Sequence, residues 1–282
     1  MNPEARDRVL MCPPDYFSVD YVINPWMAGN EGQLERGLAG RQWQALCDVI
    51  GRAADIDLMA PRADLPDLVF TANAGFIYED TVVPSHFMPQ ERRAEEPYVK
   101  AWFSDQGYDV RLLPDDVGFE GAGDCLVDRG GEWLWTGFGF RTEIEAHKYL
   151  AKWFDQEIVS IRLTDSRFYH IDTCLCPLSG GYLLYFPPAF DADSLAAIEA
   201  RVPADRRLAV TASDAANFAC NAVNIGEHIV AHRFSQDLRD RLTALGFRVQ
   251  ETPLSEFLKA GGSAKCLTLR LSEPPARSRG TA

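Results

Sequence analysis

The stretch DTCLCPLSGGYLLYF, residues 172–186, has the pattern of a β-hairpin. Its apolar runs Leu175–Leu178 and Tyr182–Phe186 flank a turn at Ser179–Gly181, and glycine pairs of this kind are typical of tight hairpin turns. Elsewhere in the chain, apolar runs again flank a glycine or acidic turn, which predicts hairpins at residues 76–83, 126–136 and 223–231. The chain is therefore rich in short hairpins.

A polar residue or a cysteine recurs at intervals of about fifty residues, in most cases just before a hairpin. The series is Asn24, Asn73, Asp124, Asp172, Asn221 and Cys266. An amphipathic helix and a further short strand follow each hairpin. The helices are expected at residues 34–52, 91–106, 143–154, 191–201 and 235–246, with Thr142 and Ser235 as N-caps. The repeating unit is ββαβ, present about five times.

A unit of this size cannot bury the faces of its own sheet, so five copies predict a closed ring of small sheets around an axis. The fold class is therefore α/β, a five-bladed pseudosymmetric ββαβ propeller, in which the first and last segments complete one unit between them. The alternative is an ordinary α/β sheet with coincidental spacing. We expect one catalytic domain over residues 1–274 and a disordered tail at residues 275–282.

Composition excludes several classes of partner. The 282 residues contain 28 Lys+Arg and 41 Asp+Glu, a formal net charge of -13, which argues against nucleic acid or an anionic membrane as partner. The charge is weakly compatible with a small cationic substrate. No apolar run reaches the ~18 residues of a membrane helix, and the polar N-terminus argues against a signal peptide. An odd number of cysteines, seven, favours reduced thiols and a cytoplasmic location.

Neither cysteine nor histidine spacing indicates a metal site. Cys174 and Cys176 are too close for a typical zinc pair, and His228 and His232 lie in a strand-like run. We therefore expect no metal and no cofactor. The sequence leaves open whether the protein is a homo-oligomer.

If the recurring residues converge at one mouth of the axis, they form a single reactive cluster. Its members are Asn73, Glu120, Asp124, His170, Asp172 and Cys266. A free cysteine is usually a small buried apolar residue, yet the glycine-rich segment before Cys266 could stabilise a thiolate through backbone N–H groups. His170 and Asp172 are expected on one strand face, where His170 is either structural or a proton carrier. Carboxylates, a thiolate and an imidazole are the groups that chemistry on a guanidinium requires.

Three motifs resemble the guanidine-modifying superfamily of arginine deiminases, dimethylarginine dimethylaminohydrolases, agmatine deiminases and amidinotransferases. They are EGAGD at 120–124, HIDT at 170–173 and GGSAKC at 261–266. That superfamily has a five-bladed ββαβ propeller, the pentein fold. The resemblance implies that Cys266 is the nucleophile of an amidino-thioether intermediate. It also implies that His170 is the general acid and base, that Glu120 orients it, and that Asp172 binds the guanidinium.

One position departs from the deiminases, which usually have an aspartate where this chain has Asn73. A neutral amide donates as well as accepts hydrogen bonds, so it could hold a ureido intermediate whose carbonyl needs a donor. Asn73 and the segments 11–17, 22–27, 90–93 and 139–142 resemble the arginine dihydrolases of the superfamily. By the same resemblance Asn24, Arg92 and Arg141 contact the substrate, the two arginines through its α-carboxylate.

The function implied by this resemblance is hydrolysis of free arginine to ornithine, carbon dioxide and two ammonia. A dimethylarginine dimethylaminohydrolase giving citrulline and dimethylamine is the alternative, as is an arginine deiminase giving citrulline. A non-catalytic binding protein on the same fold is disfavoured by the joint presence of Cys266, His170 and Glu120. An amidinotransferase is disfavoured by the short chain.

Overall fold

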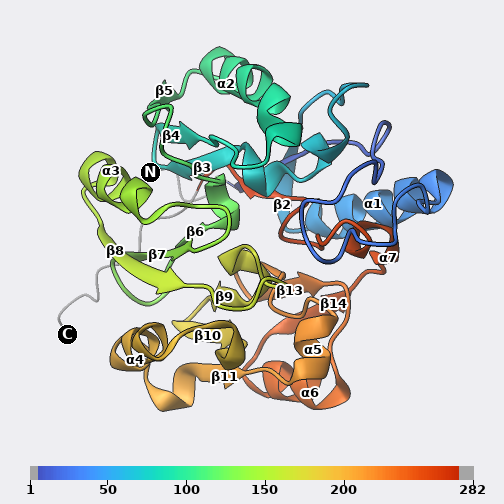
Figure 1. The fold of residues 1–282 in the computed structure, drawn as a ribbon. Coiled ribbons are helices and arrows are strands. Elements are labelled where there is room, and N and C mark those ends of the chain that lie inside the picture. Colours follow the sequence, from blue (N-terminus) through green and yellow to red (C-terminus); the bar gives the residue numbers. More distant parts are fainter. Residues whose placement is uncertain (1–5, 273–282) are drawn as a thin grey trace.

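The computed structural model describes residues 6–272. Figure 1 looks along an axis that five three-stranded sheets surround, and each sheet is one ββαβ unit. In chain order, the sheets are β3 (Gly75–Tyr78), β4 (Thr81–Pro84) and β5 (Asp109–Val110); β6 (Cys125–Val127), β7 (Trp133–Phe138) and β8 (Glu157–Arg162); β9 (Leu175–Leu178), β10 (Tyr182–Tyr185) and β11 (Arg207–Ala209); β12 (Val223–Ile225), β13 (His228–Ala231) and β14 (Arg248–Glu251); and β15 (Leu269–Arg270), β1 (Asp7–Met11) and β2 (Ala54–Leu58). The predicted α/β propeller of five ββαβ units is confirmed.

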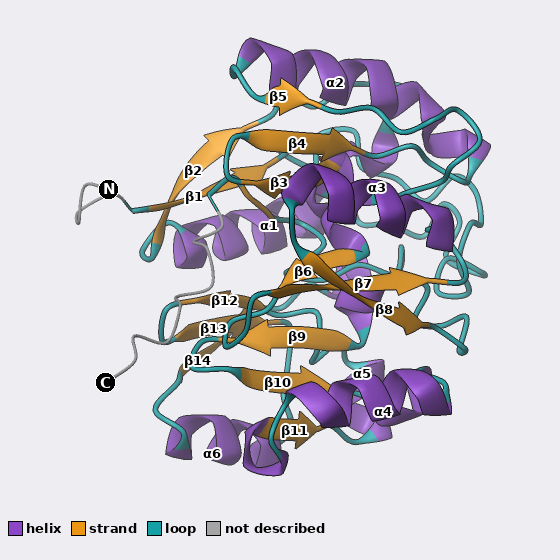
Figure 2. Ribbon diagram, turned by 90° about the vertical axis from the view of Figure 1, so that its left-hand side faces the viewer, coloured by secondary structure: helices purple, strands orange, loops and turns teal. Residues whose placement is uncertain are grey.

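Every unit has the same topology. Its first two strands are antiparallel, its middle and third strands are parallel, and a helix makes the parallel crossover. The crossover helices are α2 (Glu96–Asp105), α3 (Ile144–Phe154), α4 (Ala192–Arg201), α6 (Gln236–Ala244) and α1 (Arg36–Ile50). All five lie on the outside of the ring, with the strands inside (Figures 1 and 2).

The fifth sheet joins the two ends of the described chain. β15 pairs antiparallel with β1, with Val9 opposite Arg270, and β1 pairs parallel with β2. As expected, the first and last segments complete one unit. The expected tail at residues 275–282 lies outside the described residues, so the assignment of residues 1–274 to one domain stays a prediction.

The crossover helices pack on the sheets through apolar stripes. In α3, Ala146, Leu150 and Phe154 are buried at a spacing of four residues, which places them on one face. Burying a leucine or phenylalanine side chain of this kind contributes roughly 1.5–3 kcal/mol. Packing of the helices therefore holds each small sheet, which is too short to be stable alone. No helix among residues 6–272 is long and apolar enough to cross a membrane.

Among the local predictions, one helix is divided in the structure, one N-cap is confirmed and one is wrong. The helix expected at residues 91–106 is divided into a 3₁₀ helix, η3 (Gln90–Glu95), and α2, whose first turn contains Pro97; proline suits that turn because its missing N–H would have no helical partner there. Ser235 caps α6 as expected. Thr142 does not cap α3, because its hydroxyl contacts the ring centre instead.

Asn24 also differs from its expected place, since no strand follows it. The segment from residue 12 to residue 35 contains no helix or strand and leads directly into α1. In the unit that contains β1, the position at the start of the first strand belongs to Cys266, which precedes β15. The interval between Asn24 and Asn73 is thus unrelated to the repeat. The remaining elements are the short helices α5 (Ala212–Ala216) and α7 (Ser255–Leu258) and six further 3₁₀ helices, η1 (Pro66–Val69), η2 (Thr71–Ala74), η4 (Gly121–Gly123), η5 (Ile171–Thr173), η6 (Pro187–Ala189) and η7 (Ala204–Arg206).

Candidate active site

The recurring polar residues meet at the ring centre and join neighbouring units. Five of them, Asn73, Asp124, Asp172, Asn221 and Cys266, lie in the turn just before the first strand of a sheet, and each takes part in a hydrogen bond to a neighbouring unit. The bonds run from Asn73 Nδ2 to Glu120 O (3.2 Å), from Ile171 N to Asp124 Oδ1 (3.0 Å), from Asn221 Nδ2 to Asp172 O (3.1 Å), from Cys266 N to Asn221 Oδ1 (3.1 Å) and from Ala72 N to Cys266 O (3.1 Å). The last bond closes the circle, so the predicted convergence is present.

His170 lies in this circle with both ring nitrogens near polar groups. Its Nε2 lies 2.8 Å from Glu120 Oε2, and its Nδ1 lies 3.5 Å from the amide nitrogen of Asn73. A Cβ on Gly123 would lie 2.5 Å from the Asn73 amide nitrogen and 3.1 Å from His170 Nδ1. Only glycine at position 123 therefore allows this approach, which explains the small residues of the EGAGD motif.

The prediction that His170 and Asp172 share a strand face is wrong. His170 precedes η5, which contains Asp172, and a 3₁₀ turn points successive side chains in different directions. The imidazole contacts Glu120, whereas the carboxylate of Asp172 lies beside Cys266. The two side chains therefore contact different residues of the site.

Glu120 links His170 to a buried arginine. Its Oε2 accepts a hydrogen bond from Arg141 Nη1 at 2.9 Å, and Oε1 accepts one from Met88 N at 3.3 Å. Burial alone would raise the pKa of this carboxyl, but Arg141 and His170 outweigh burial and lower the pKa to about 2. Glu120 is therefore an anion that holds the imidazole in one orientation.

Asn73 is fixed from both ends of its amide. Its oxygen accepts from Arg92 Nη1 at 2.9 Å, while its nitrogen donates to Glu120 O and faces His170. Arg92 in turn makes a buried bidentate ion pair with Glu95, with both contacts at 2.8 Å. The site thus presents an N–H donor of Asn73 beside His170.

Cys266 is surrounded by polar groups although it is buried. Asn221 Nδ2 lies 3.1 Å from its Sγ, and Asp172 Oδ2 lies 3.7 Å away. Burial and the neighbouring Asp172 raise the pKa of the thiol, whereas Asn221, the backbone N–H of Ser263 and Lys265 lower it. Burial also raises the pKa of Asp172, to about 7, against the opposing effect of Lys265. The resting sulfur is a thiol near a carboxyl that titrates near neutral pH.

One small cavity collects most of the predicted substrate-binding residues. Its lining includes Asn24, Asn73, Arg92, Arg141 and Cys266. Its volume is about 10 Å³, roughly the space that one water molecule needs. Asn24 closes it from the segment before α1, where its amide donates to Ala260 O at 3.0 Å. A ligand larger than one water molecule therefore requires this cavity to widen.

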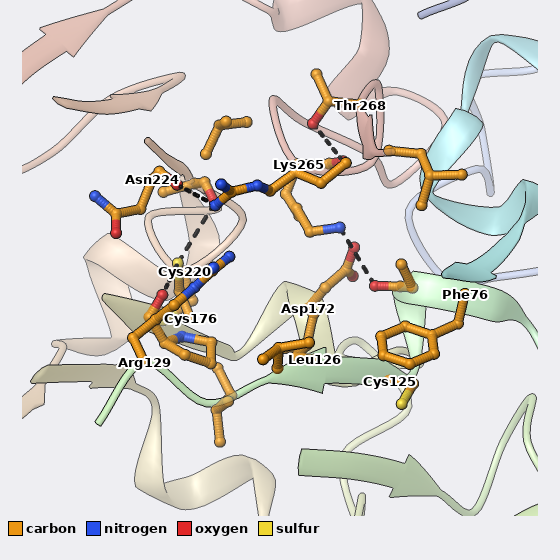
Figure 3. Close-up of a pocket in the computed structure, with 18 of the residues that line it drawn as sticks. Phe76, Cys125, Leu126, Arg129, Asp172, Cys176, Cys220, Asn224, Lys265 and Thr268 are labelled. Atoms are coloured by element: carbon orange, nitrogen blue, oxygen red, sulfur yellow. Dashed lines mark hydrogen bonds between the residues drawn. The ribbon is translucent and has the colours of Figure 1, made fainter. Parts of the chain in front are cut away.

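Asp172, Glu120 and His170 do not line this cavity, but each contacts a residue that does. Asp172 lines a second cavity, to which all five units contribute residues (Figure 3). There the Nζ of Lys265 donates to Ala122 O at 3.4 Å, close to the Asp172 carboxylate. Asp172 therefore lines the second cavity and contacts the sulfur of Cys266, which lines the first.

Two residues of the site were not among those predicted from the sequence. Asp67 lines the substrate cavity, and its Oδ1 is buried with no hydrogen-bond partner, while its Oδ2 accepts from Tyr21. Burial raises the pKa of Asp67, against the opposing effect of Arg92. Asn221 bonds the reactive sulfur. The repeat contained a signal for Asn221, since this residue belongs to the recurring series, but no such pattern points to Asp67.

Metal ligation has no support in the described part of the chain. Among residues 6–272, no group of three or more His, Cys, Asp or Glu side chains is arranged to hold a metal ion. The polar groups around Cys266 are instead hydrogen-bonded to one another, so acid–base and nucleophilic chemistry are what this site can perform.

Comparisons with known proteins agree with this geometry. A family profile described as "N,N dimethylarginine dimethylhydrolase, eukaryotic" matches residues 20–272. The N(G),N(G)-dimethylarginine dimethylaminohydrolase of Mycobacterium tuberculosis is 38% identical over 271 residues, covering 96% of this chain and 87% of that protein. The bifunctional arginine dihydrolase/ornithine cyclodeaminase ArgZ of Synechocystis is 57% identical over 267 residues, covering 95% of this chain but 38% of that protein.

A solved structure matches nearly the whole fold. The N-terminal domain of ArgZ, crystallised as a cysteine-to-serine mutant with bound substrate, superposes with a TM-score of 0.94 and 56% identity, covering 95% of this chain and 99% of that one. The chain therefore spans about two fifths of the full-length bifunctional relatives that it matches, and nearly all of this separate domain.

Proposed function

Since the chain belongs to the N,N dimethylarginine dimethylhydrolase family, we propose that it is a hydrolase acting on the guanidinium group of free arginine. The products are ornithine, carbon dioxide and two ammonia. The observation that carries the proposal is the amide of Asn73, which stands between Arg92 and His170 in the cavity of Cys266. The similarity of the chain to the arginine dihydrolase domain of ArgZ supports the same reaction.

The cavity offers complementary groups for both ends of arginine. Arg92 and Arg141 line it and would bind the α-carboxylate, each through N–H groups beyond those already used. The unpartnered Oδ1 of Asp67 would accept from the α-ammonium, which removes the cost of leaving that oxygen buried and unpaired. Asn24 would contact the bound amino acid from the segment before α1, because its side chain lines the same cavity.

The guanidinium then lies between Cys266 and the carboxylates behind it. Its positive charge favours ionisation of the nearby thiol, since an opposite charge lowers the pKa of an acid. The thiolate attacks the central carbon and forms a C–S bond. The thiol proton passes through His170 to the leaving nitrogen, so ammonia departs and an amidino-thioether remains. Glu120 stabilises the protonated imidazole during this transfer.

Water then replaces the sulfur, with His170 as base, and gives a ureido group. Asn73 decides the fate of this group, because its N–H can donate to the ureido oxygen and hold it for a second attack. The second round releases another ammonia and leaves a thiocarbamate, which water converts to ornithine and carbon dioxide. Arginine and two water molecules together contain all the atoms of ornithine, carbon dioxide and two ammonia, so no other reactant is needed.

Dimethylarginine is the second candidate substrate, favoured by the family profile and by the Mycobacterium relative. One assay separates the candidates: purified protein is given arginine or dimethylarginine, and ammonia, ornithine, citrulline and dimethylamine are quantified. Two ammonia for each ornithine support the proposal. Accumulation of citrulline from arginine would identify a deiminase, and dimethylamine release would identify a dimethylaminohydrolase. The cytoplasm, where the seven cysteines would stay unpaired as they are here, is part of this proposal.

A further inference from the structure

Asn221 makes the shortest polar contact that the structure assigns to the sulfur of Cys266. Its side chain is fully buried, with 0% exposure. The amide nitrogen donates to Cys266 Sγ and to Asp172 O, both at 3.1 Å. The amide oxygen accepts from Cys266 N at 3.1 Å. One side chain therefore holds both the backbone and the reactive atom of the candidate nucleophile.

The backbone around Asn221 fixes the direction of this amide. Phe218 has φ 56°, in the left-handed region that a bulky side chain rarely adopts. Its carbonyl accepts from Asn221 N at 3.0 Å, and its ring packs on Trp26 with centroids 4.7 Å apart. Strained backbone of this kind persists where surrounding packing enforces it and is concentrated at functional sites. The strain here lies in the turn that aims Asn221 at the sulfur.

We propose that Asn221 is a catalytic residue whose amide N–H stabilises the thiolate of Cys266 during attack. A thiolate in an apolar environment is costly, and a preorganised donor that points at the developing charge lowers that cost without reorganisation. The backbone N–H of Ser263 adds a second donor on the same sulfur. This inference rests on the proposed role of Cys266, but it does not depend on which guanidino compound is the substrate.

A purely structural role is the competing explanation, because Asn221 also joins neighbouring units of the ring. The two explanations predict opposite effects on alkylation of Cys266, which is only 2% exposed. Loss of a structural support would loosen the site and accelerate alkylation. Loss of the thiolate donor would raise the pKa of the thiol and slow alkylation, since only the thiolate reacts.

Two variants and a matched control make the test. Asn221→Asp keeps an acceptor for Cys266 N but replaces the donor by an oxygen. Asn221→Leu removes the donor without adding charge. Asn224→Asp is the control, because Asn224 is buried in the same sheet and donates only to Gly226 O and His228 O. Alkylation of Cys266 by iodoacetamide is followed by mass spectrometry of its peptide from pH 6 to 10, beside melting temperature and turnover of arginine.

The alkylation rate of Cys266 in both Asn221 variants is expected to be at most about one tenth of the wild-type rate at each pH. The rate in Asn224→Asp is expected to match the wild type. Each tenfold corresponds to a pKa rise of about one unit. The turnover number should fall about tenfold to hundredfold, the range for a hydrogen bond to a charged group. If either folded Asn221 variant is alkylated as fast as the wild type or faster, the proposal is wrong. Absence of arginine turnover in the wild type would refute the proposed function and leave the alkylation result decisive for Asn221.

Discussion

Replacement of Glu120 by glutamine separates the electrostatic role of this residue from its shape. The substitution keeps the size of the side chain but removes the charge that Arg141 and His170 share. The pKa of Glu120 is lowered from 4.5 to about 2, which corresponds to roughly 3 kcal/mol at about 1.4 kcal/mol per pKa unit. Because Arg141 would remain as a buried charge without a counterion, a loss of about 3 kcal/mol or more is expected.

The effect of Glu120→Gln on the free energy of unfolding is expected to depend on pH. A carboxyl whose pKa is lowered by folding stabilises the protein above its unfolded pKa of 4.5, and this stabilisation disappears as the pH falls towards 2. The difference between wild type and Glu120→Gln should therefore be full at pH 7 and fall to about 1 kcal/mol near pH 3.

Urea unfolding at pH 7, 4 and 3, followed by circular dichroism, measures this difference. Glu145→Gln serves as the control, because Glu145 forms an exposed ion pair with Lys148 and should contribute little. Turnover is expected to fall by about 10²–10⁴ since His170 loses the charged partner that orients its ring for proton transfer. An equal free energy of unfolding for Glu120→Gln and the wild type at pH 7 would refute the reasoning.

Three further substitutions test the remaining groups. Cys266→Ser should abolish turnover while keeping arginine binding, because a hydroxyl lacks thiolate character; measurable turnover by the serine variant would exclude Cys266 as nucleophile. Asn73→Asp should release citrulline or slow the second hydrolysis, since a carboxylate cannot donate to a ureido oxygen; an unchanged product ratio and rate, measured by chromatography, would show that Asn73 does not set the outcome. Asp172→Asn should raise the free energy of unfolding at pH 8 and leave it unchanged near pH 4, because burial raises the pKa of this carboxyl to about 7 and its ionised form is costly only at higher pH; turnover should fall, and unfolding curves that match the wild type at both pH values would contradict the assigned environment.

The fold was predictable because the sequence of each unit contains the signals for its own hairpin and helix. A glycine turn between two apolar runs specifies a hairpin within about fifteen residues, and the helix after it has its own apolar stripe and cap, as Ser235 illustrates. Repetition of such units leaves closure of the ring as the way to bury every sheet. Even the fifth sheet, which joins residues from the two ends of the chain, was predictable from the count of incomplete segments.

The site was only partly predictable because its contacts cross between units. Asn221 precedes β12, yet its amide contacts Asp172 of the preceding unit and Cys266 of the following one. Asp67 becomes a cavity residue only through Tyr21 and Arg92, which are distant in sequence. A local pattern specifies backbone, whereas these partners depend on how units meet. The position of Asn24 was misjudged for the same reason, since its interval matched the repeat by coincidence.

The ring also limits which residues can carry the chemistry. Each polar residue at the centre closes one hydrogen bond between units, so a functional substitution must preserve a donor or an acceptor there. Asn73 satisfies both demands: its nitrogen donates to Glu120 O and its oxygen accepts from Arg92. An aspartate at this position would accept from Arg92 but place two oxygens against each other at Glu120, which requires a compensating change nearby. The choice between amide and carboxylate at position 73 is therefore coupled to the contact between two units, so a change of reaction made at this position alone should weaken that contact.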